Sequence, residues 1–409
     1  MRSNRDIKAI YAVLGALQRA LGDHLTALYS FGGISACTYC TSPDGINLLV
    51  VISDNTRMQD VSQALRQVWR LHSAELGQVP LVARRASFLR HLKLDPILAY
   101  DLVATGEKLA GESLLTDYPI PDPIELLARI ASETMRASAV LAPTMISQQE
   151  SDRAVNSLRC LAKEYLAEDY SPADPPAKIY SGVQRYTAYQ VGRYDGLAWN
   201  ANEESRTAPV LEVLLSVYSM DNRLLLVLPD LPADELADRI ASTDWRSVAS
   251  RIAGEYRGLR LTTPAQLRLV LQLERAADFT LGTFELAWGV DLLSDMEINR
   301  WRILRDLARL PSDILIDTLP RSLIVCNDSD LPVLVHDLQN KLLNIQLRTE
   351  LFSRMEYSVA EMPPVPLPDR SAPNHVRIEA IANQLDWWAD YYHQEMDSAL
   401  TLIGQSGFL

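Results

Sequence analysis

The feature that most constrains the fold of this chain is an internal repeat. Residues 105–120, TGEKLAGESLLTDYPI, align with residues 283–298, TFELAWGVDLLSDMEI, at an offset of 178 residues. The two segments share seven identities in sixteen positions, among them Gly111 with Gly289. A repeat at a fixed offset indicates that a chain is built from copies of one smaller unit.

The alignment continues on both sides of these segments with small gaps. Three further matches keep the same order along the chain: residues 47–54 with 223–230, Trp69-Arg70 with Trp245-Arg246, and residues 141–152 with 319–330. Collinear matches predict a tandem duplication, in which residues from about 1 to 200 and from about 201 to 400 are two diverged copies.

The hydrophobic pattern of the first copy predicts a small sheet followed by helices. Apolar runs with β-branched residues are typical of buried strands, and apolar residues three and four apart are typical of helices. The expected strands are 25–31, 47–53 and 80–84, with a strand and turn at 96–111. The expected helices are 4–22, 56–75 and 86–94, and then 124–140, 148–169 and 177–198.

The second copy repeats this plan. Residues 211–219 and 223–230 are expected to form an apolar hairpin, with Asp221-Asn222 near its turn. Its apolar face needs cover, which we expect from the other copy or from a helix at 385–396. The remaining expected elements are a strand at 258–263, helices at 232–255, 296–310, 329–355 and 374–403, and a proline-rich linker at 361–373.

These elements define an α/β (α+β) fold class. Two tandem duplicated mixed-sheet modules are each followed by a helical subdomain. The expected sheet modules are residues 1–118 and 205–295, and the expected helical subdomains are residues 119–200 and 296–409.

Charge and hydropathy limit the partners that we expect. The formal net charge of −13 repels nucleic-acid backbones, so no nucleic-acid partner is expected. No run of 18 apolar residues occurs, so we expect no membrane partner. The longest basic cluster is interpreted as solvated surface. It consists of Arg84-Arg85, Arg90, His91 and Lys93.

The cysteines do not form a zinc motif. Cys37 and Cys40 make a lone C-x2-C, whereas a structural zinc site needs four ligands, and no second such pair occurs. The six histidines are scattered without metal-ligand spacing, so no metal is expected. We interpret the four cysteines as free thiols of a cytoplasmic protein.

Three segments occur in an order that resembles a known fold: SFGG (30–33), DGINLLVVISD (44–54) and LVATGEKLAGES (102–113). Their order and spacing are similar to the nucleotidyltransferase fold of the DNA polymerase beta superfamily, in its small-molecule adenylyltransferase branch. In that fold two carboxylates two residues apart share one face of a strand and hold Mg²⁺ at the nucleotide phosphates. A third carboxylate on a neighbouring strand activates the attacking hydroxyl.

The resemblance can be carried onto the first copy residue by residue. It implies that Gly32 and Gly33 contact the nucleotide phosphates. It places the two carboxylate positions on Gly45 and Asn47, neither of which is a carboxylate. Asp44 is one residue out of register, although a turn there could rescue it as a relict ligand.

In the second copy the aligned pair is Asp221 and Arg223. An arginine at a metal-ligand position repels the metal cation. The third carboxylate is also missing, because neither of the strands on which it would be expected, 80–84 and 258–263, contains an acidic residue. We therefore expect a non-catalytic pseudo-nucleotidyltransferase that acts as a binding or assembly protein without a cofactor. The alternative is a Mg²⁺-dependent nucleotidyltransferase acting on a small-molecule or protein hydroxyl.

The segment 385–396, LDWWADYYHQEM, contains four clustered aromatic residues, Trp387, Trp388, Tyr391 and Tyr392. Aromatic residues three and four apart on a helix pack one face against a neighbour. That neighbour is either the core of the same chain or an interface with a second copy or a protein partner. A nucleotide is a further possible ligand.

Overall fold

The computed structural model has a mixed α/β fold with two four-stranded sheets, which confirms the predicted class. It divides into two compact units: unit 1 is residues 1–120 with 303–409, and unit 2 is residues 121–302. The structure describes residues 4–32, 46–76, 78–141, 148–167, 170–171, 173–193, 214–220, 223–250, 258–282, 284–356, 363 and 366–406. No helix in these ranges is both long and apolar enough to cross a membrane.

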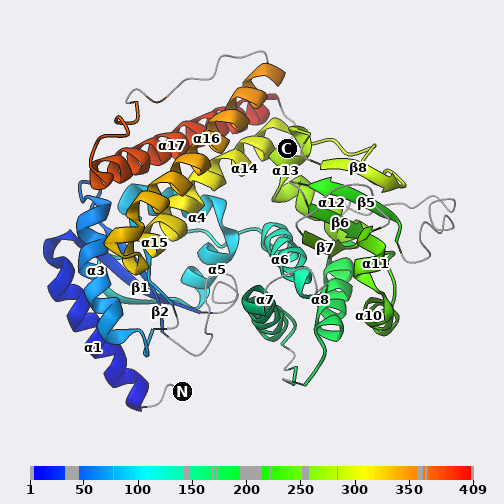
Figure 1. The fold of residues 1–409 in the computed structure, drawn as a ribbon, viewed down its shortest axis with the longest axis horizontal. Helices are drawn as coiled ribbons and strands as arrows, with labels where there is room; N and C mark the ends of the chain where they lie inside the picture. The colour runs from blue at the N-terminus through cyan, green and yellow to red at the C-terminus, as the bar shows by residue number, and fades with distance from the viewer. Residues whose placement is uncertain are drawn as a thin grey trace. The chain divides into compact units, whose positions relative to one another are not determined.

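Unit 1 contains a sheet with strand order β3-β2-β1-β4, of which Figure 1 labels β1 and β2. β1 pairs antiparallel with β2 and β4, whereas β2 and β3 are parallel. All six residues of β2 are buried, the pattern of a strand covered on both faces. The strands are β1 (Leu25–Phe31), β2 (Asn47–Ile52), β3 (Leu81–Arg84) and β4 (Glu107–Gly111).

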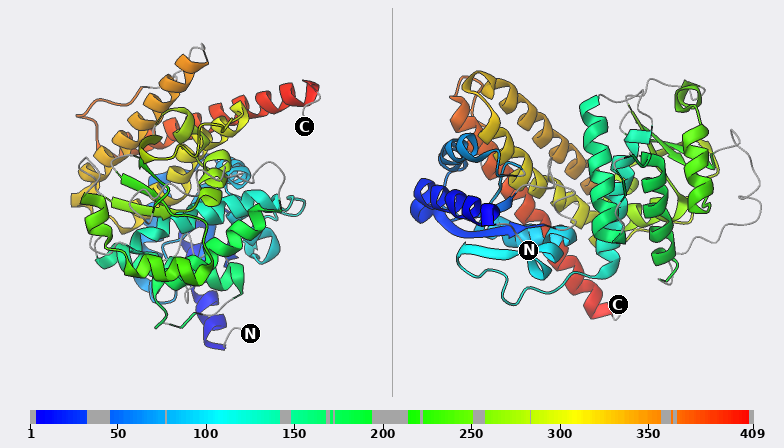
Figure 2. Two further views of the ribbon diagram at one scale, coloured as in Figure 1. Left: turned by 90° about the vertical axis from the view of Figure 1, so that its right-hand side faces the viewer. Right: turned by 90° about the horizontal axis from the view of Figure 1, so that it is seen from below.

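Helices from both ends of the chain complete unit 1. The first group is α1 (Asn4–Leu21), α3 (Met58–His72), α4 (Arg85–Leu94) and α5 (Pro96–Ala104). The second group is α14 (Arg300–Asp313), the π-helix η5 (Ile314–Thr318), α15 (Leu319–Val325), α16 (Leu331–Met355) and α17 (Asn374–Ser406). α15 packs on α3 and β3, and α17 lies beside α16 and packs on α3 and α4 (Figures 1 and 2).

The strand predicted to begin at residue 96 is wrong in its first half. Residues 96–104 form α5 instead, because Asp95 caps it: one carboxylate oxygen accepts hydrogen bonds from the amides of Ile97 and Leu98, both at 3.1 Å. Pro96 occupies the first turn, where its missing N–H costs nothing. The second half of the prediction is confirmed by β4.

Unit 2 contains a sheet of the same topology, in the order β7-β6-β5-β8. The pairing directions also match those of the first sheet. Its strands are β5 (Ser216–Met220), β6 (Arg223–Val227), β7 (Gly258–Thr262) and β8 (Phe284–Gly289). Its helices are α6 (Pro123–Ala137), α7 (Gln148–Leu161), α8 (Pro176–Val191), α10 (Ala233–Ser242), α11 (Trp245–Ser250), α12 (Pro264–Leu273) and α13 (Ala276–Thr280).

The apolar face of the β5-β6 hairpin is covered inside unit 2. Val217, Leu224 and Leu226 belong to one buried cluster with Ile179 and Tyr180 of α8. This agrees with our expectation that the other copy would provide the cover, because α8 lies in residues 119–200, the expected helical subdomain of the first copy, whereas the helix at 385–396 contributes none of the described residues in this cluster. The segment immediately before the hairpin in sequence, α8, provides it.

Two glycines occupy matching places in the two sheets. Gly111 and Gly289 end β4 and β8 with positive φ angles of 77° and 97°. A Cβ added at Gly111 would lie 2.1 Å from the carbonyl oxygen of Thr26, and a Cβ added at Gly289 would lie 2.4 Å from that of Leu215. Only glycine fits such close approach, which explains why the repeat signal is strongest at this place. The match supports the proposed duplication.

Relative to their order in the sequence, the helical segments are exchanged between the two sheets. Residues 121–200, which follow the first sheet in sequence, belong to the compact unit of the second sheet, and residues 303–409 belong to the unit of the first. Sequence order does not specify on which of two similar sheets a helical segment packs. The exchange resembles a domain swap within one chain.

Candidate ligand-binding site

The strand ends that the family resemblance singles out in unit 1 lie together. Gly32 follows β1 directly, and Asn47, the first residue of β2, pairs with Phe31 at the end of β1. The side chain of Asn47 is buried, with only 5% of the residue exposed. Gly33, Asp44 and Gly45 lie outside the described residues, as do Cys37 and Cys40.

The equivalent region of the second sheet, at the start of β6, carries arginine side chains. Arg223 begins β6 opposite Met220 of β5 and is exposed, and Arg260 lies on the neighbouring strand β7. Asp221 lies outside the described residues. Neither β3 nor β7 contains an acidic residue, as the sequence indicated. Within the described ranges, no group of three His, Cys, Asp or Glu residues could hold a metal ion.

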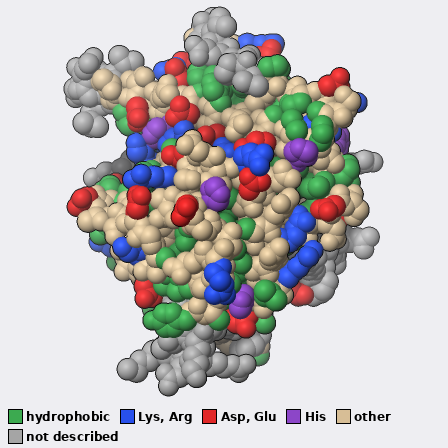
Figure 3. Space-filling model, turned by 90° about the vertical axis from the view of Figure 1, so that its left-hand side faces the viewer, with side chains coloured by type: hydrophobic (Ala, Val, Ile, Leu, Met, Phe, Trp, Pro, Cys, Tyr) green, Lys and Arg blue, Asp and Glu red, His purple; other side chains and the backbone are tan. Residues whose placement is uncertain are grey.

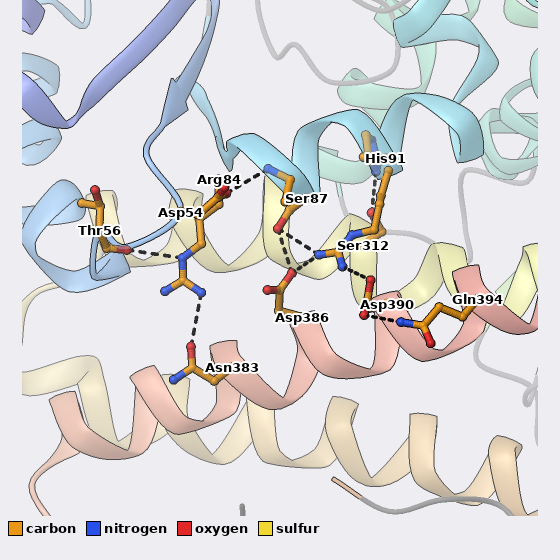
Figure 4. Close-up of polar contacts among 12 residues, drawn as sticks. Asp54, Thr56, Arg84, Ser87, His91, Ser312, Asn383, Asp386, Asp390 and Gln394 are labelled. Atoms are coloured by element: carbon orange, nitrogen blue, oxygen red, sulfur yellow. Dashed lines mark hydrogen bonds and ion pairs between the residues drawn. The ribbon is translucent and has the colours of Figure 1, made fainter. Parts of the chain in front are cut away.

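The opposite end of the first sheet, where the parallel strands β2 and β3 end, is rich in polar contacts (Figure 4). Arg84 ends β3 and reaches α17, with Nη2 2.7 Å from Glu379 and Nη1 3.2 Å from the side-chain oxygen of Asn383. Its Nε donates to the carbonyl of Thr56 at 3.3 Å. The other oxygen of Glu379 accepts from the backbone amide of Met58, the first residue of α3, at 3.2 Å.

The contacts continue along α4 and α17 as a polar ladder (Figure 4). Arg90 bridges Asp386 and Asp390, with a distance of 2.6 Å to Asp390. Ser87 donates to Asp386 at 2.8 Å, and Lys93 contacts His393 at 3.0 Å.

The ladder corrects our interpretation of the basic cluster at 84–93 as solvated surface. Arg84 and Arg90 bind acidic residues that lie nearly 300 positions later in the sequence. His91 is buried, with Nδ1 2.9 Å from the hydroxyl of Ser312 on α14. On the face drawn in Figure 3, acidic and basic side chains are interspersed, and no large area is basic alone.

A cavity of about 500 Å³ opens beside this network, between the start of α3 and the first half of α17. Its lining includes Arg57, His375, Asn383 and the half-buried ring of Trp387, together with apolar atoms of Val376 and Ala380. The volume lies within the range of pockets that bind small molecules. The Arg84 contacts fix Glu379 and Asn383 at the cavity wall.

The four aromatic residues of α17 divide into two pairs. Trp388 and Tyr392 are buried, at 0% and 1% exposure, and the Tyr392 hydroxyl contacts that of Thr349 on α16. Trp387 and Tyr391 are partly exposed and stack with ring centroids 5.4 Å apart and nearly parallel planes. One pair is therefore core, and of the other pair Trp387 lines the cavity.

The expectation of four free thiols is wrong for Cys160, which is disulfide-bonded. Cys326 is a free thiol. A disulfide requires only that two cysteines meet in space, so sequence spacing gives no signal for it.

Comparison with protein-family models, with curated proteins and with solved structures finds no match to this chain. The site therefore has to be interpreted from its own geometry. Sequence patterns missed it because its walls come from α3 and α17, which are distant in sequence.

Proposed function

We propose that this chain is a non-catalytic binding protein with a nucleotidyltransferase-like arrangement of strands, and that the cavity between α3 and α17 is its ligand site. The observation that carries the proposal is the cavity itself: along one side of α17 it is lined by the ring of Trp387 and by the polar groups of Glu379 and Asn383, whose positions are fixed by Arg84. Preorganised polar groups in an apolar pocket give orientation and specificity to a bound molecule.

The lining defines the class of ligand. A partly exposed tryptophan ring offers a flat stacking surface. Asn383 offers hydrogen-bonding groups about one helical turn from it, and His375 lines the cavity about three turns from it, toward the start of α17. Glu379 lies at the same wall but is paired with Arg84, and Arg57 also lines the cavity, so the lining has no surplus of either charge and favours a ligand of low charge. We infer that the ligand is a planar heteroaromatic molecule without a dense negative charge.

The strand-end residues support the non-catalytic part of the proposal. Asn47 is a neutral and buried side chain, and Arg223 is a cation, at the positions where the related fold has magnesium ligands. Mg²⁺ prefers carboxylate oxygens and keeps several waters, so a buried amide or a guanidinium is a poor replacement.

The cavity can be tested with planar fragments such as indole, quinoline and adenine, observed by ligand NMR in the presence of the whole protein. We expect Ala380→Trp, which fills the cavity, to abolish fragment binding. Leu400→Trp adds the same indole to an exposed place on α17 and should leave binding intact. Fragment binding that survives Ala380→Trp would refute the cavity as the site.

The alternative, a Mg²⁺-dependent nucleotidyltransferase, predicts a different result. Incubation with labelled ATP, GTP, CTP or UTP and Mg²⁺ should then release pyrophosphate, and Asp44→Ala should stop the release. Our proposal predicts no pyrophosphate above the level of a buffer control with any of the four nucleotides.

A further inference from the structure

Two arginines share one face of adjacent strands in unit 2. Arg223 of β6 is paired with Gly258 of β7, and Leu225 of β6 is paired with Arg260 of β7. Residues two apart on a strand point to the same face, so both arginine side chains leave the sheet on the same side. The Arg223 side chain lies over Gly258, with Cγ 3.7 Å from the place where a Cβ would stand.

Two more arginines approach from the helices on that face. Arg275 follows α12, with Nη1 3.2 Å from the sulfur of Met220 and Nε 2.9 Å from Asp278. Arg136, in the last turn of α6, pairs with Glu133. The four arginines are thus contributed by β6, β7, α6 and the connection between α12 and α13.

The charges of this cluster do not balance within the described residues. Arg136 and Arg275 each have an acidic partner, but Arg223 and Arg260 have neither a hydrogen bond nor an ion pair to any residue that the structure describes. Burial, and then Arg275, Arg223 and Arg136, lower the pKa of Arg260 to about 9, and Glu133 opposes this shift only in part. Arg260 remains a cation at neutral pH, where like-charge repulsion destabilises the unliganded cluster.

We propose that Arg223 and Arg260, supported by Arg136 and Arg275, form a metal-free binding site for the phosphoryl groups of a small molecule. A guanidinium matches phosphate oxygens with two parallel hydrogen bonds, and such charge-assisted bonds are strong in a partly buried site. Cations supplied by the protein here take the place of the Mg²⁺ that neutralises phosphates in related folds. The surplus charge stands out in a chain whose net charge is −13.

This site and the cavity beside α17 have no residue in common. The cavity carries Glu379 and favours a ligand of low charge, whereas the arginine cluster selects an anion. Failure of one proposal therefore leaves the other standing.

The test is calorimetric titration of the whole protein with inorganic pyrophosphate and, separately, with ATP, both in excess EDTA. We expect binding of both probes. Arg223→Gln and Arg260→Gln should each weaken it about tenfold or more, because each removes a charged hydrogen-bond donor. Arg185→Gln removes the same charge from an exposed position on α8 and should change affinity little.

The unliganded variants give a second readout. Arg260→Gln removes the repulsion, so its melting temperature without ligand should equal or exceed that of the wild type, while the stabilisation by pyrophosphate is lost. Should Arg260→Gln fail to fold, the exposed Arg223→Gln carries the test alone. Equal loss in Arg185→Gln, binding that appears only with Mg²⁺, or no binding of either probe would overturn the proposal.

Discussion

At the scale of single residues, positions 111 and 289 are the ones where the backbone most clearly requires glycine. We predict that alanine at either position destabilises its unit by about 2 kcal/mol or more, because the new Cβ meets a backbone oxygen and the φ angle is positive. Gly22→Ala and Gly282→Ala are matched controls, since those glycines have positive φ but nothing within 4 Å. Each control substitution should lower the free energy of unfolding, measured by urea denaturation, by about 1 kcal/mol.

The neighbouring residues Trp387 and Trp388 give a second prediction. Trp388→Ala empties a fully buried position and should destabilise the protein by about 3–5 kcal/mol in chemical denaturation. Trp387→Ala should cost clearly less, because its ring is partly exposed. Equal costs would contradict the division of these residues into core and cavity wall.

Residue patterns predicted much of the sheets and little of the site. The apolar run at 47–53 predicted β2 to within one residue, because a buried central strand has a strong local signature. Asp95-Pro96 carried a helix-start signal that outweighed the apolar run after it. Arg84 and Arg90 were misinterpreted because their partners on α17 are set by tertiary packing, which no local pattern contains.

At the scale of elements, the ladder between α4 and α17 should contribute to docking of the last helix. In a double-mutant cycle of Arg90→Ala and Asp386→Ala we expect a coupling of about 1 kcal/mol, because Arg90 is only 15% exposed and Asp386 31%. The pair Arg354 and Glu350 on α16 is the control: both side chains are mostly exposed, and their coupling should be much smaller.

The stability of the contact between α4 and α17 should depend on pH through His393. Burial first, and then the charge of Lys93, lower the pKa of His393 below its ordinary value. The unfolded chain therefore binds a proton that the folded chain does not, and stability should fall as pH drops below about 6.5. His393→Gln should flatten this dependence in denaturant melts between pH 5 and 7 (roughly the range in which histidine titrates), whereas His336→Gln, an exposed site on α16, should not.

At the scale of the whole molecule, the exchange of helical segments predicts which fragments can fold. Residues 121–302 contain a complete sheet with helices on both faces, so this fragment should unfold cooperatively on its own. A fragment of residues 1–200 lacks η5, α15 and α17, which pack on β3, α3 and α4, and should not. Cooperative unfolding of 1–200 and 201–409 as separate halves would show that each sheet folds with its own following helices.

The claim that joins fold and function is that this chain binds without metal-dependent catalysis. Thermal denaturation with ATP, GTP, CTP and UTP, each with Mg²⁺ and with EDTA, tests it most directly. We expect that a stabilising nucleotide raises the melting temperature in EDTA at least as much as with Mg²⁺, since arginines rather than a metal are proposed to neutralise the phosphates. Stabilisation that requires Mg²⁺ and disappears in Asp44→Ala would contradict it.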